Sequence, residues 1–349
     1  MQKTNKLNRP CRDIQSGFLV KGFYVIFLLF TYFGLQAQER FEYAHQQMGT
    51  QIRLVFFTSD KEKANSIASK AFDRIDELNK KLSDYIVTSE LNSLTKQHKK
   101  EVVVSNDLFR ILKKSVEISE ITKGAFDISV GPLIQLWRKT RKTRILPTKA
   151  NLVEANQRVG YKYITFPDIN VVLLKTQEMR LDLGGIGKGF AADEVIKVLE
   201  SNGVSSALVD MGGDIRVSNP PPNREYWILA FSYYDEENVE VVEKIRMKNA
   251  AVATSGDLYQ FVEIDGIRYS HIINPLTGMA LNNSIQVTTI ARNATEADAF
   301  ASAFSVMNIA NVKINSKVLT NLETLMIHHS KEGYLKWNSE GFNRYLIKK

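Results

Sequence analysis

Residues 251–280 read AVATSGDLYQFVEIDGIRYSHIINPLTGMA and hold the most informative pattern in this chain. The first three of them are small and apolar, and they predict a buried strand. Thr254, Ser255 and Gly256 follow, and three small residues predict a turn whose backbone groups face a ligand. We therefore expect a strand that ends in a ligand-facing turn.

A hairpin is predicted directly after this turn. The runs 259–264 and 267–273 alternate between apolar and polar residues, as two strands do. Asp265-Gly266 lies between them and favours the positive φ angles of a tight primed turn. The second strand carries His271, and a histidine with an ordinary pKa of about 6.5 suits proton transfer at neutral pH. His271 is thus a candidate general base, and a structural histidine bonded to a backbone carbonyl is the alternative.

The composition is that of a globular protein, with 349 residues, of which 44% are hydrophobic and 24% charged. Residues 1–38 predict a secretory signal peptide, because a basic leader precedes the apolar run 23–34 and the small Ala37 follows it. This run is short for a membrane span, and an uncleaved anchor is the alternative. Residues 39–349 are then expected to form a single domain that is exported to the periplasm, where association with the inner membrane is left open.

Cysteine and charge exclude several classes of function. Cys11 is the only cysteine and lies in the leader, so thiol catalysis and cysteine metal sites are excluded for the mature chain. The formal charge is +8, and the basic run 138–144 raises the question of nucleic acid. No stacking pattern or nucleic-acid motif accompanies the run. We interpret it as a solvated loop, with docking of an acidic partner as the alternative and no nucleic acid as a partner.

Periodicity along the rest of the chain predicts an α+β fold with a largely antiparallel sheet and helices set to one side. Apolar spacing predicts helices over 64–78, from Asp107 to a left-handed cap at Gly124, and over 190–202. Short β-rich runs predict the strands 52–57, 102–104, 207–209, 226–233 and 239–247.

A glycine-rich segment, GGIGKG at 184–189, lies before the helix predicted over 190–202. Two β-rich runs between 169 and 183 precede it, so a strand, a turn and a helix N-terminus are expected in succession. This arrangement lets backbone N–H groups meet a phosphate, although the spacing matches neither a Walker loop nor a Rossmann fingerprint. A plain tight turn is the alternative. Lys188 is a candidate for contact with a pyrophosphate, and its alternative is an exposed lysine at a helix start.

A helix is expected to begin at Thr295, where Thr295 and Asp298 match a capping box. Asp298 and Ser302 are four residues apart, so they lie on one face of this helix and both oxygens can reach one ion. Mg²⁺ prefers oxygen ligands and also binds phosphate oxygens of a substrate. The pair therefore predicts a magnesium site, and a purely capping role is the alternative for Asp298.

These segments together resemble the ApbE family of FAD:protein FMN transferases. The Thr-Ser-Gly turn and the loop HIINPLTG match family motifs, as do LDLGGIGKGFAAD, ALVDMGGDI and TEADAFASAFSVM. All occur in the family's order, and weaker matches at 48–50, 83–85 and 125–127 extend the resemblance over nearly the whole chain after residue 40. The resemblance implies an ApbE-like fold with a cleft for FAD between two halves.

The resemblance also implies site residues. In the family, the glycine-rich segment gives a backbone oxygen to the metal, and this oxygen maps to Gly185. The other implied metal ligands are Asp298 and Ser302, and the family usually has threonine at the position of Ser302. Asn274 departs from the aspartate common in the loop, so no catalytic duty is assigned to it. The residues expected to contact FAD are Met48, Tyr85, Ala125, Phe126, Asp127, Asp182, Lys188, Thr254, Ser255, Gly256 and Ile272.

The implied activity is protein flavinylation. FMN would pass from FAD, the substrate, to a threonine of an acceptor protein with release of AMP, with Mg²⁺ as cofactor and His271 as base. The implied acceptors are exported redox proteins that carry a threonine flavinylation motif. Two alternatives stay open: a pyrophosphatase that splits FAD into FMN and AMP, and an exported flavin-binding protein without catalysis.

Overall fold

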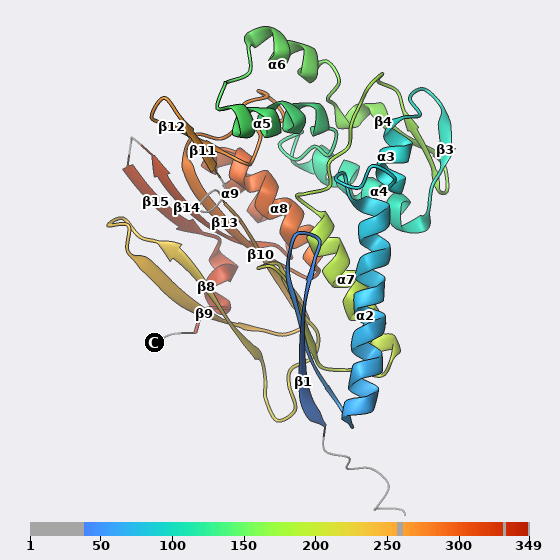
Figure 1. Cartoon of the computed structure of the whole chain (residues 1–349). Helices are drawn as coiled ribbons and strands as arrows, with labels where there is room; N and C mark the ends of the chain where they lie inside the picture. The colour runs from blue at the N-terminus through green and yellow to red at the C-terminus, as the bar shows by residue number, and fades with distance from the viewer. Residues whose placement is uncertain (1–37, 257–260, 331–332, 348–349) are drawn as a thin grey trace, which may run out of the picture. The chain divides into compact units, whose positions relative to one another are not determined.

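An eight-stranded sheet dominates the computed structural model (Figure 1), which describes residues 38–256, 261–330 and 333–347. Each strand pairs antiparallel with its neighbour, so the predicted antiparallel sheet is confirmed. In spatial order the strands are β1 (Glu39–Gln47), β2 (Thr50–Thr58), β6 (Ala207–Met211), β7 (Ile215–Val217), β10 (Ala250–Gly256), β13 (Ser284–Ala291), β14 (Glu323–Ser330) and β15 (Gly333–Asn338).

Both faces of this sheet are covered. Successive side chains on a strand point to opposite faces, so Leu54 and Phe56 of β2 enter one hydrophobic core while Val55 enters another. The first core lies under helices, as predicted, and the second lies under a two-stranded antiparallel ribbon. The helices are α2 (Lys61–Leu82), α4 (Asn106–Ile121), α7 (Gly187–Ser201) and α8 (Ala294–Val306), and the ribbon consists of β8 (Trp227–Tyr234) and β9 (Glu240–Met247).

A third, smaller core joins helix α5 to the predicted hairpin, and Trp137 and Tyr269 pack together in it. Figure 1 shows α5, α6, β11 and β12 grouped at the end of the molecule away from the foot of α2. The elements of this end and the remaining short ones are α3 (Glu90–Thr95), β3 (Glu101–Val103), α5 (Gly131–Thr143), α6 (Lys149–Asn156), η1 (Tyr161–Tyr163), β4 (Ile164–Asp168), β5 (Val171–Leu174), β11 (Phe261–Ile264), β12 (Ile267–Ser270), α9 (Ile309–Val318) and η2 (Glu340–Arg344).

The predicted hairpin is confirmed. Strands β11 and β12 pair antiparallel with Ile264 opposite Ile267. Asp265 and Gly266 connect them with φ angles of 52° and 73°, as a primed two-residue turn requires. Residues 259 and 260 of the first predicted strand lie outside the described residues.

The predicted turn at Thr254, Ser255 and Gly256 is wrong. These residues end strand β10, with Thr254 opposite Thr288 and Gly256 opposite Gln286 of β13. A Cβ on Gly256 would lie 2.9 Å from the carbonyl oxygen of Ile285. The glycine is therefore explained by the close approach of two strands instead of by a turn.

Two other local predictions are also wrong. The basic run 138–144 forms the last turns of α5 instead of a loop, because Leu133 and Trp137 bury one stripe of a helix. No strand forms in the second β-rich run before the glycines, 179–183. Its residues make a single isolated β-bridge, between Val130 and Arg180. The helix after the glycines begins at Gly187, earlier than predicted.

The predicted signal peptide, residues 1–38, lies outside the described residues except for Gln38, and its cleavage stays a prediction. Residues 39–349 form one compact unit. Among the described residues, no helix has the length and apolar character that a membrane crossing needs.

An ion-pair network around Arg74 connects α2, α4 and α7. Arg74 donates to Asp107 Oδ1 at 2.5 Å and to Glu194 Oε2 at 2.7 Å. The hydrogen bond from Arg74 lowers the pKa of Asp107 to about 2. Burial acts to raise the pKa of Glu194, but hydrogen bonds from Arg110, Lys197 and Arg74 outweigh it and lower this pKa to about 2. Both carboxylates are therefore ionised partners in the folded state.

We expect this network to make the protein sensitive to acid. A carboxylate with a lowered pKa in the folded state contributes stability above its unfolded pKa, and this stability is lost as the pH falls through the folded pKa. For Glu194 the window runs from 4.5 down to about 2. Because solvent partly screens these ion pairs, urea titrations across this window should show a loss of about 2 kcal/mol from this group, less than the full pKa shift corresponds to, and Glu194→Gln should remove this loss. The exposed Glu117→Gln is the control, and equal pH slopes in the Glu194→Gln and Glu117→Gln proteins would contradict the assignment.

Candidate active site

Asp298 and Ser302 on α8 both lie against the glycine-rich turn that begins α7. Asp298 Oδ2 accepts a hydrogen bond from the backbone N–H of Gly189 at 3.0 Å. Gly185 lies so close to α8 that an added Cβ would be 2.9 Å from Ser302 Oγ. At Gly189 a Cβ would be 2.1 Å from the carbonyl oxygen of Ala294, so only glycine allows this approach of α7 to α8. The three predicted metal ligands, Gly185, Asp298 and Ser302, are therefore neighbours.

The capping box predicted for Asp298 is wrong. Asn293 is the N-cap of α8, and its Oδ1 accepts from the N–H of Glu296 at 2.8 Å. The Thr295 hydroxyl donates to Asp193 of α7 at 2.6 Å. Because other residues complete this helix end, the Asp298 carboxylate has no capping role and points toward the start of α7.

Charge in this group is concentrated and buried. Asp298 is only 5% exposed, and burial together with the charge of Asp214 raises its pKa to about 7. Lys188 donates to Asp214 Oδ2 at 2.5 Å, so the lysine predicted to meet a pyrophosphate is held by a carboxylate of the protein. Desolvation acts to lower the pKa of Lys188, but Asp214 and Asp298 outweigh it and raise this pKa.

This donor set fits a hard divalent cation. Asp298 supplies a buried carboxylate whose ionisation burial opposes, and a bound cation would offset that cost. The Ser302 hydroxyl and the backbone of Gly185 add neutral oxygens beside it. Among the described residues no group of three or more His, Cys, Asp or Glu side chains is placed to hold a metal. A cation here would thus depend on hydroxyl, carbonyl and substrate oxygens as well as on one carboxylate.

A second group of site residues surrounds Arg138 of α5. Arg138 donates to Asp84 at 2.5 Å and to Asp182 Oδ2 at 3.1 Å, and its guanidinium carbon lies 4.2 Å from the centre of the Tyr85 ring. The Tyr85 side chain is 76% exposed, so the ring offers an open face beside these charges. Burial, with the neighbouring charge of Asp84, raises the pKa of Asp182. Sequence reasoning missed Arg138, although the helical spacing of Trp137 with Leu133 was a signal that this run is not a loop.

The two groups are directly connected. Asp182 Oδ1 accepts from the N–H of Gly184 at 2.8 Å, and Gly184 precedes Gly185 in the chain. The Tyr85 ring is therefore linked through Arg138 to one end of the short segment 182–185, and Ser302 of α8 lies beside the other end.

The predicted FAD residues Ala125, Phe126 and Asp127 are buried beneath this segment. A Cβ on Gly185 would lie 3.4 Å from the Phe126 ring. Both oxygens of Asp127 are used inside the protein: one accepts from the N–H and hydroxyl of Ser129, and the other from the N–H of Tyr161. Burial raises the pKa of Asp127. Its carboxylate thus orders the surrounding backbone.

Met48 lies in the turn between β1 and β2, with a φ angle of 50°, and its side chain packs against the main core. Thr50 follows and lies beside Gly212, where a Cβ would be 2.0 Å from Thr50 Oγ1. The turns 48–49 and 211–214 are therefore neighbours. Met48 lies at the same end of the paired strands β2 and β6 as Asp214.

His271 lies half-buried directly after β12, in a segment held on both sides. Ser270 N–H donates to the carbonyl of Leu281 at 2.7 Å, and Leu281 N–H donates to the carbonyl of Ile272 at 3.0 Å. The Trp137 indole then donates to the carbonyl of Gly278 at 2.9 Å, which attaches the following loop to α5. Helix α5 thus contacts this loop through Trp137, and it contacts Asp84, Tyr85 and Asp182 through the next residue, Arg138.

Thr254 lies at the exposed end of β10. Its hydroxyl shares a hydrogen bond of 2.9 Å with the hydroxyl of Thr288 on the neighbouring strand β13.

Two cavities, of about 570 and 650 Å³, are lined by other residues and by none of the predicted site residues. The cleft for FAD between two halves therefore stays a prediction.

The sequence profile of the ApbE family matches residues 48–325. This chain belongs to the ApbE family. A Vibrio cholerae protein named FAD:protein FMN transferase is 29% identical over 306 residues, which cover 86% of this chain and 91% of that protein.

Solved ApbE structures share the fold. The flavin transferase ApbE from Vibrio cholerae has a TM-score of 0.80 at 28% identity, covering 88% of this chain and 100% of that one. The ApbE protein from Thermotoga maritima has a TM-score of 0.79 at 30% identity, covering 89% and 100%. The predicted ApbE-like α+β fold and the enzyme class, flavin transferase, are confirmed. The roles of individual residues stay predictions.

Proposed function

We propose that this ApbE protein transfers FMN from FAD to a threonine of an acceptor protein, with Mg²⁺ as cofactor and AMP as the second product. The observation that carries the proposal is the connection of two groups through the segment 182–185. The Tyr85 ring lies at one end, and the oxygens of Asp298 and Ser302 lie at the other. FAD needs both features, because its flavin ring stacks on aromatic surfaces and its pyrophosphate is recognised by cations and N–H donors.

Different residues of the chain would bind different parts of FAD. The exposed face of Tyr85 would support the flavin ring, and Arg138 orients both Tyr85 and Asp182. The start of α7, which no side chain caps, would face the pyrophosphate with the positive end of its helix dipole. Gly185, Asp298 and Ser302 would hold Mg²⁺, which when bound supplies charge neutralisation to the phosphates.

The chemical step needs a base, because a threonine hydroxyl is a weak nucleophile at neutral pH. We assign this role to His271, whose backbone is held on both sides and attached to α5. An unprotonated imidazole nitrogen takes the proton of the threonine hydroxyl as its oxygen attacks the flavin-side phosphorus. The bond between this phosphorus and the bridging oxygen breaks, AMP leaves, and FMN stays on the acceptor as a phosphoester.

The proposal extends to the acceptors and the compartment. The acceptors are exported redox proteins with a threonine flavinylation motif, and the enzyme acts in the periplasm after export by the leader 1–38. The basic leader followed by an apolar run supports this location.

The test is transfer to a defined acceptor. Residues 39–349 are incubated with FAD, Mg²⁺ and a redox domain that carries a threonine flavinylation motif, and the products are separated on a denaturing gel. We expect yellow-green flavin fluorescence on the acceptor band, which EDTA abolishes. Free FMN and AMP with an unlabelled acceptor would instead support a pyrophosphatase, and intact FAD would support a binding protein.

Arg138→Gln should weaken the use of FAD. The change leaves Asp84 and Asp182 without their shared cation and removes the partner of the Tyr85 ring. We expect the KM for FAD to rise about 10- to 100-fold with a much smaller change in kcat, because the residue positions others and does not touch the phosphorus. Arg138→Lys should recover only part of the loss, since lysine lacks the planar fork. The exposed Lys142→Gln on the same helix is the control, and an unchanged KM in Arg138→Gln would contradict this role.

A further inference from the structure

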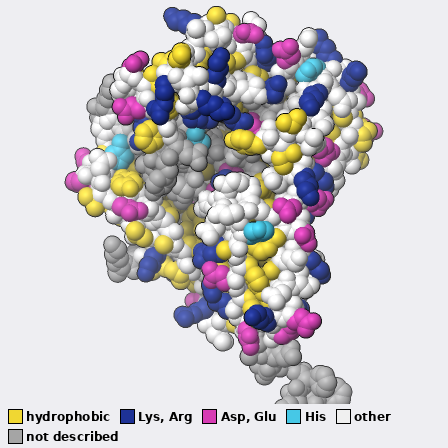
Figure 2. All heavy atoms as spheres, in the orientation of Figure 1, with side chains coloured by type: hydrophobic (Ala, Val, Ile, Leu, Met, Phe, Trp, Pro, Cys, Tyr) yellow, Lys and Arg dark blue, Asp and Glu magenta, His cyan; other side chains and the backbone are white. Residues whose placement is uncertain are grey.

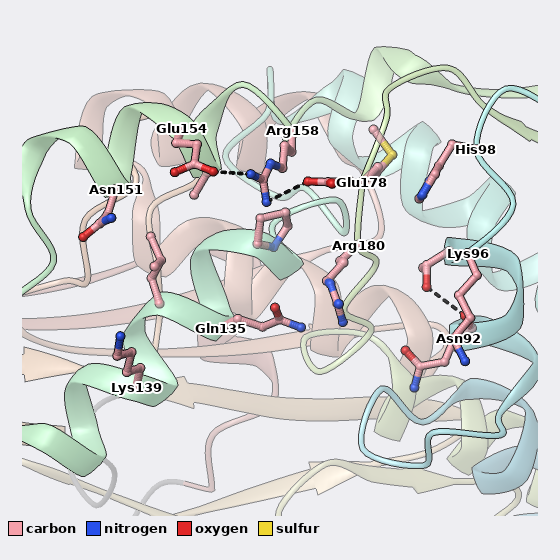
Figure 3. Close-up of a pocket in the computed structure, with 15 residues that line it drawn as sticks. Asn92, Lys96, His98, Gln135, Lys139, Asn151, Glu154, Arg158, Glu178 and Arg180 are labelled. Carbon is pink, nitrogen blue, oxygen red and sulfur yellow. Dashed lines mark hydrogen bonds and ion pairs between the residues drawn. The ribbon is translucent and has the colours of Figure 1, made fainter.

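A cavity of about 570 Å³ lies between α3, α5, α6 and the segment 178–180, apart from the residues described above (Figure 3). We call it the α3/α5/α6 hollow. Apolar side chains form part of its wall, and polar and charged side chains form the rest. The lining residues on which the argument depends are Lys96, His98, Gln135, Lys139, Arg158 and Arg180.

The two carboxylates of the hollow are already engaged. Figure 3 shows Arg158 between Glu154 and Glu178, with ion pairs to both. The distance from Arg158 to Glu178 is 3.2 Å. Neither acid therefore neutralises the other cations of the wall.

Three further cations, Lys96, Lys139 and Arg180, line the hollow without a carboxylate partner among the described residues. All three side chains are exposed. Four positive charges thus face two negative ones, which leaves an excess of two positive charges in a concave site. Such a site attracts negatively charged ligands and disfavours a metal cation.

Neutral donors complete the wall. Figure 3 shows the side chains of Gln135 and Arg180 extending toward one another from α5 and from the segment before Asp182. Nδ1 of His98 is buried and has no hydrogen-bond partner in the part of the chain that the structure describes. A buried polar atom without a partner is unfavourable, so the site gains from a ligand that supplies polar atoms. The lining contains no Phe, Tyr or Trp on which a base could stack.

We propose that the α3/α5/α6 hollow binds an acidic segment of the acceptor protein. The inference rests on the proposed transfer to a protein, which requires a surface that holds the acceptor while its threonine reaches FAD. Lys139 directly follows Arg138 on α5, and Arg180 lies two residues before Asp182. Two walls of the hollow, α5 and the segment 178–180, therefore continue directly into the group of Arg138 and Asp182. On the face of the molecule drawn in Figure 2, Lys and Arg side chains gather over the region of α5 and α6.

Binding of two labelled peptides tests the proposal without FAD. One is a short fluorescein-labelled peptide with a threonine and several glutamates, and the other has glutamines in place of the glutamates. By fluorescence anisotropy at low salt, the acidic peptide should bind the unchanged protein, and the Lys139→Gln/Arg180→Gln double variant should bind it about 10-fold more weakly. Its matched control is Arg224→Gln/Lys248→Gln, which removes the same charges from exposed positions outside the hollow.

The outcomes separate this inference from the proposed function. Equal affinity of the two peptides, or an equal loss in the control variant, would overturn it. Citrate that binds the unchanged protein and not the Lys139→Gln/Arg180→Gln variant, without binding of the acidic peptide, would also overturn it in favour of a free polycarboxylate. In the transfer assay, the double variant should have a higher KM for the acceptor and an unchanged KM for FAD. Failure of the unchanged protein to label any acceptor would count against the proposed function alone.

Discussion

Replacing Asp298 with asparagine is expected to slow FMN transfer by about 100- to 1,000-fold. Asparagine keeps an oxygen that can accept the hydrogen bond from Gly189, so the contact between α7 and α8 survives. It removes the charge of the carboxylate that we propose as a ligand of Mg²⁺ beside Gly185 and Ser302. Initial rates measured over a range of Mg²⁺ concentrations, at saturating FAD and acceptor, give the size of the effect.

The design separates loss of the metal from loss of the fold. Burial opposes the charge on Asp298, so the neutral asparagine should not lower the melting temperature without metal. Ser302→Thr keeps the hydroxyl and should transfer FMN at close to the rate of the unchanged protein. A rate in Asp298→Asn that equals the unchanged rate at every Mg²⁺ concentration would refute the metal assignment.

His271→Asn is expected to slow transfer by about 100- to 10,000-fold while FAD remains bound. Asparagine is polar and of similar size but cannot take a proton, so the change removes the proposed base and keeps the backbone hydrogen bonds around it. Single-turnover rates with FAD already bound isolate this step from substrate binding. His45→Asn, on the exposed edge strand β1, is the control. Full transfer activity in His271→Asn would remove His271 from the mechanism.

Sequence patterns predicted the elements whose causes are local. The stripe of Ala64, Ile67 and Leu78 was sufficient for α2, and Asp265-Gly266 was sufficient for the β11–β12 turn. The i, i+4 spacing of Asp298 and Ser302 placed both on one face of α8, and the structure brings Gly185 to that face.

The predictions that failed depend on contacts between distant segments. Gly256 suggested a turn, but its cause is the carbonyl of Ile285 on the neighbouring strand. Thr295 suggested a cap, but its hydroxyl bonds Asp193 about a hundred residues earlier. The sequence pattern predicts a solvated charge at Arg138, because its partners, Asp84 and Asp182, lie far away in sequence. Strand β1 was missed because most of its side chains are exposed, which leaves little apolar pattern to detect.

The most direct test of the central claim counts the products of one reaction. With FAD, Mg²⁺ and acceptor, AMP is quantified by chromatography and acceptor-bound flavin by intact mass. Transfer predicts one AMP for each flavin on the acceptor, attached at the threonine of its motif, with no accumulation of free FMN. Equal amounts of AMP and free FMN, with the mass of the acceptor unchanged, would contradict transfer and identify water as the nucleophile.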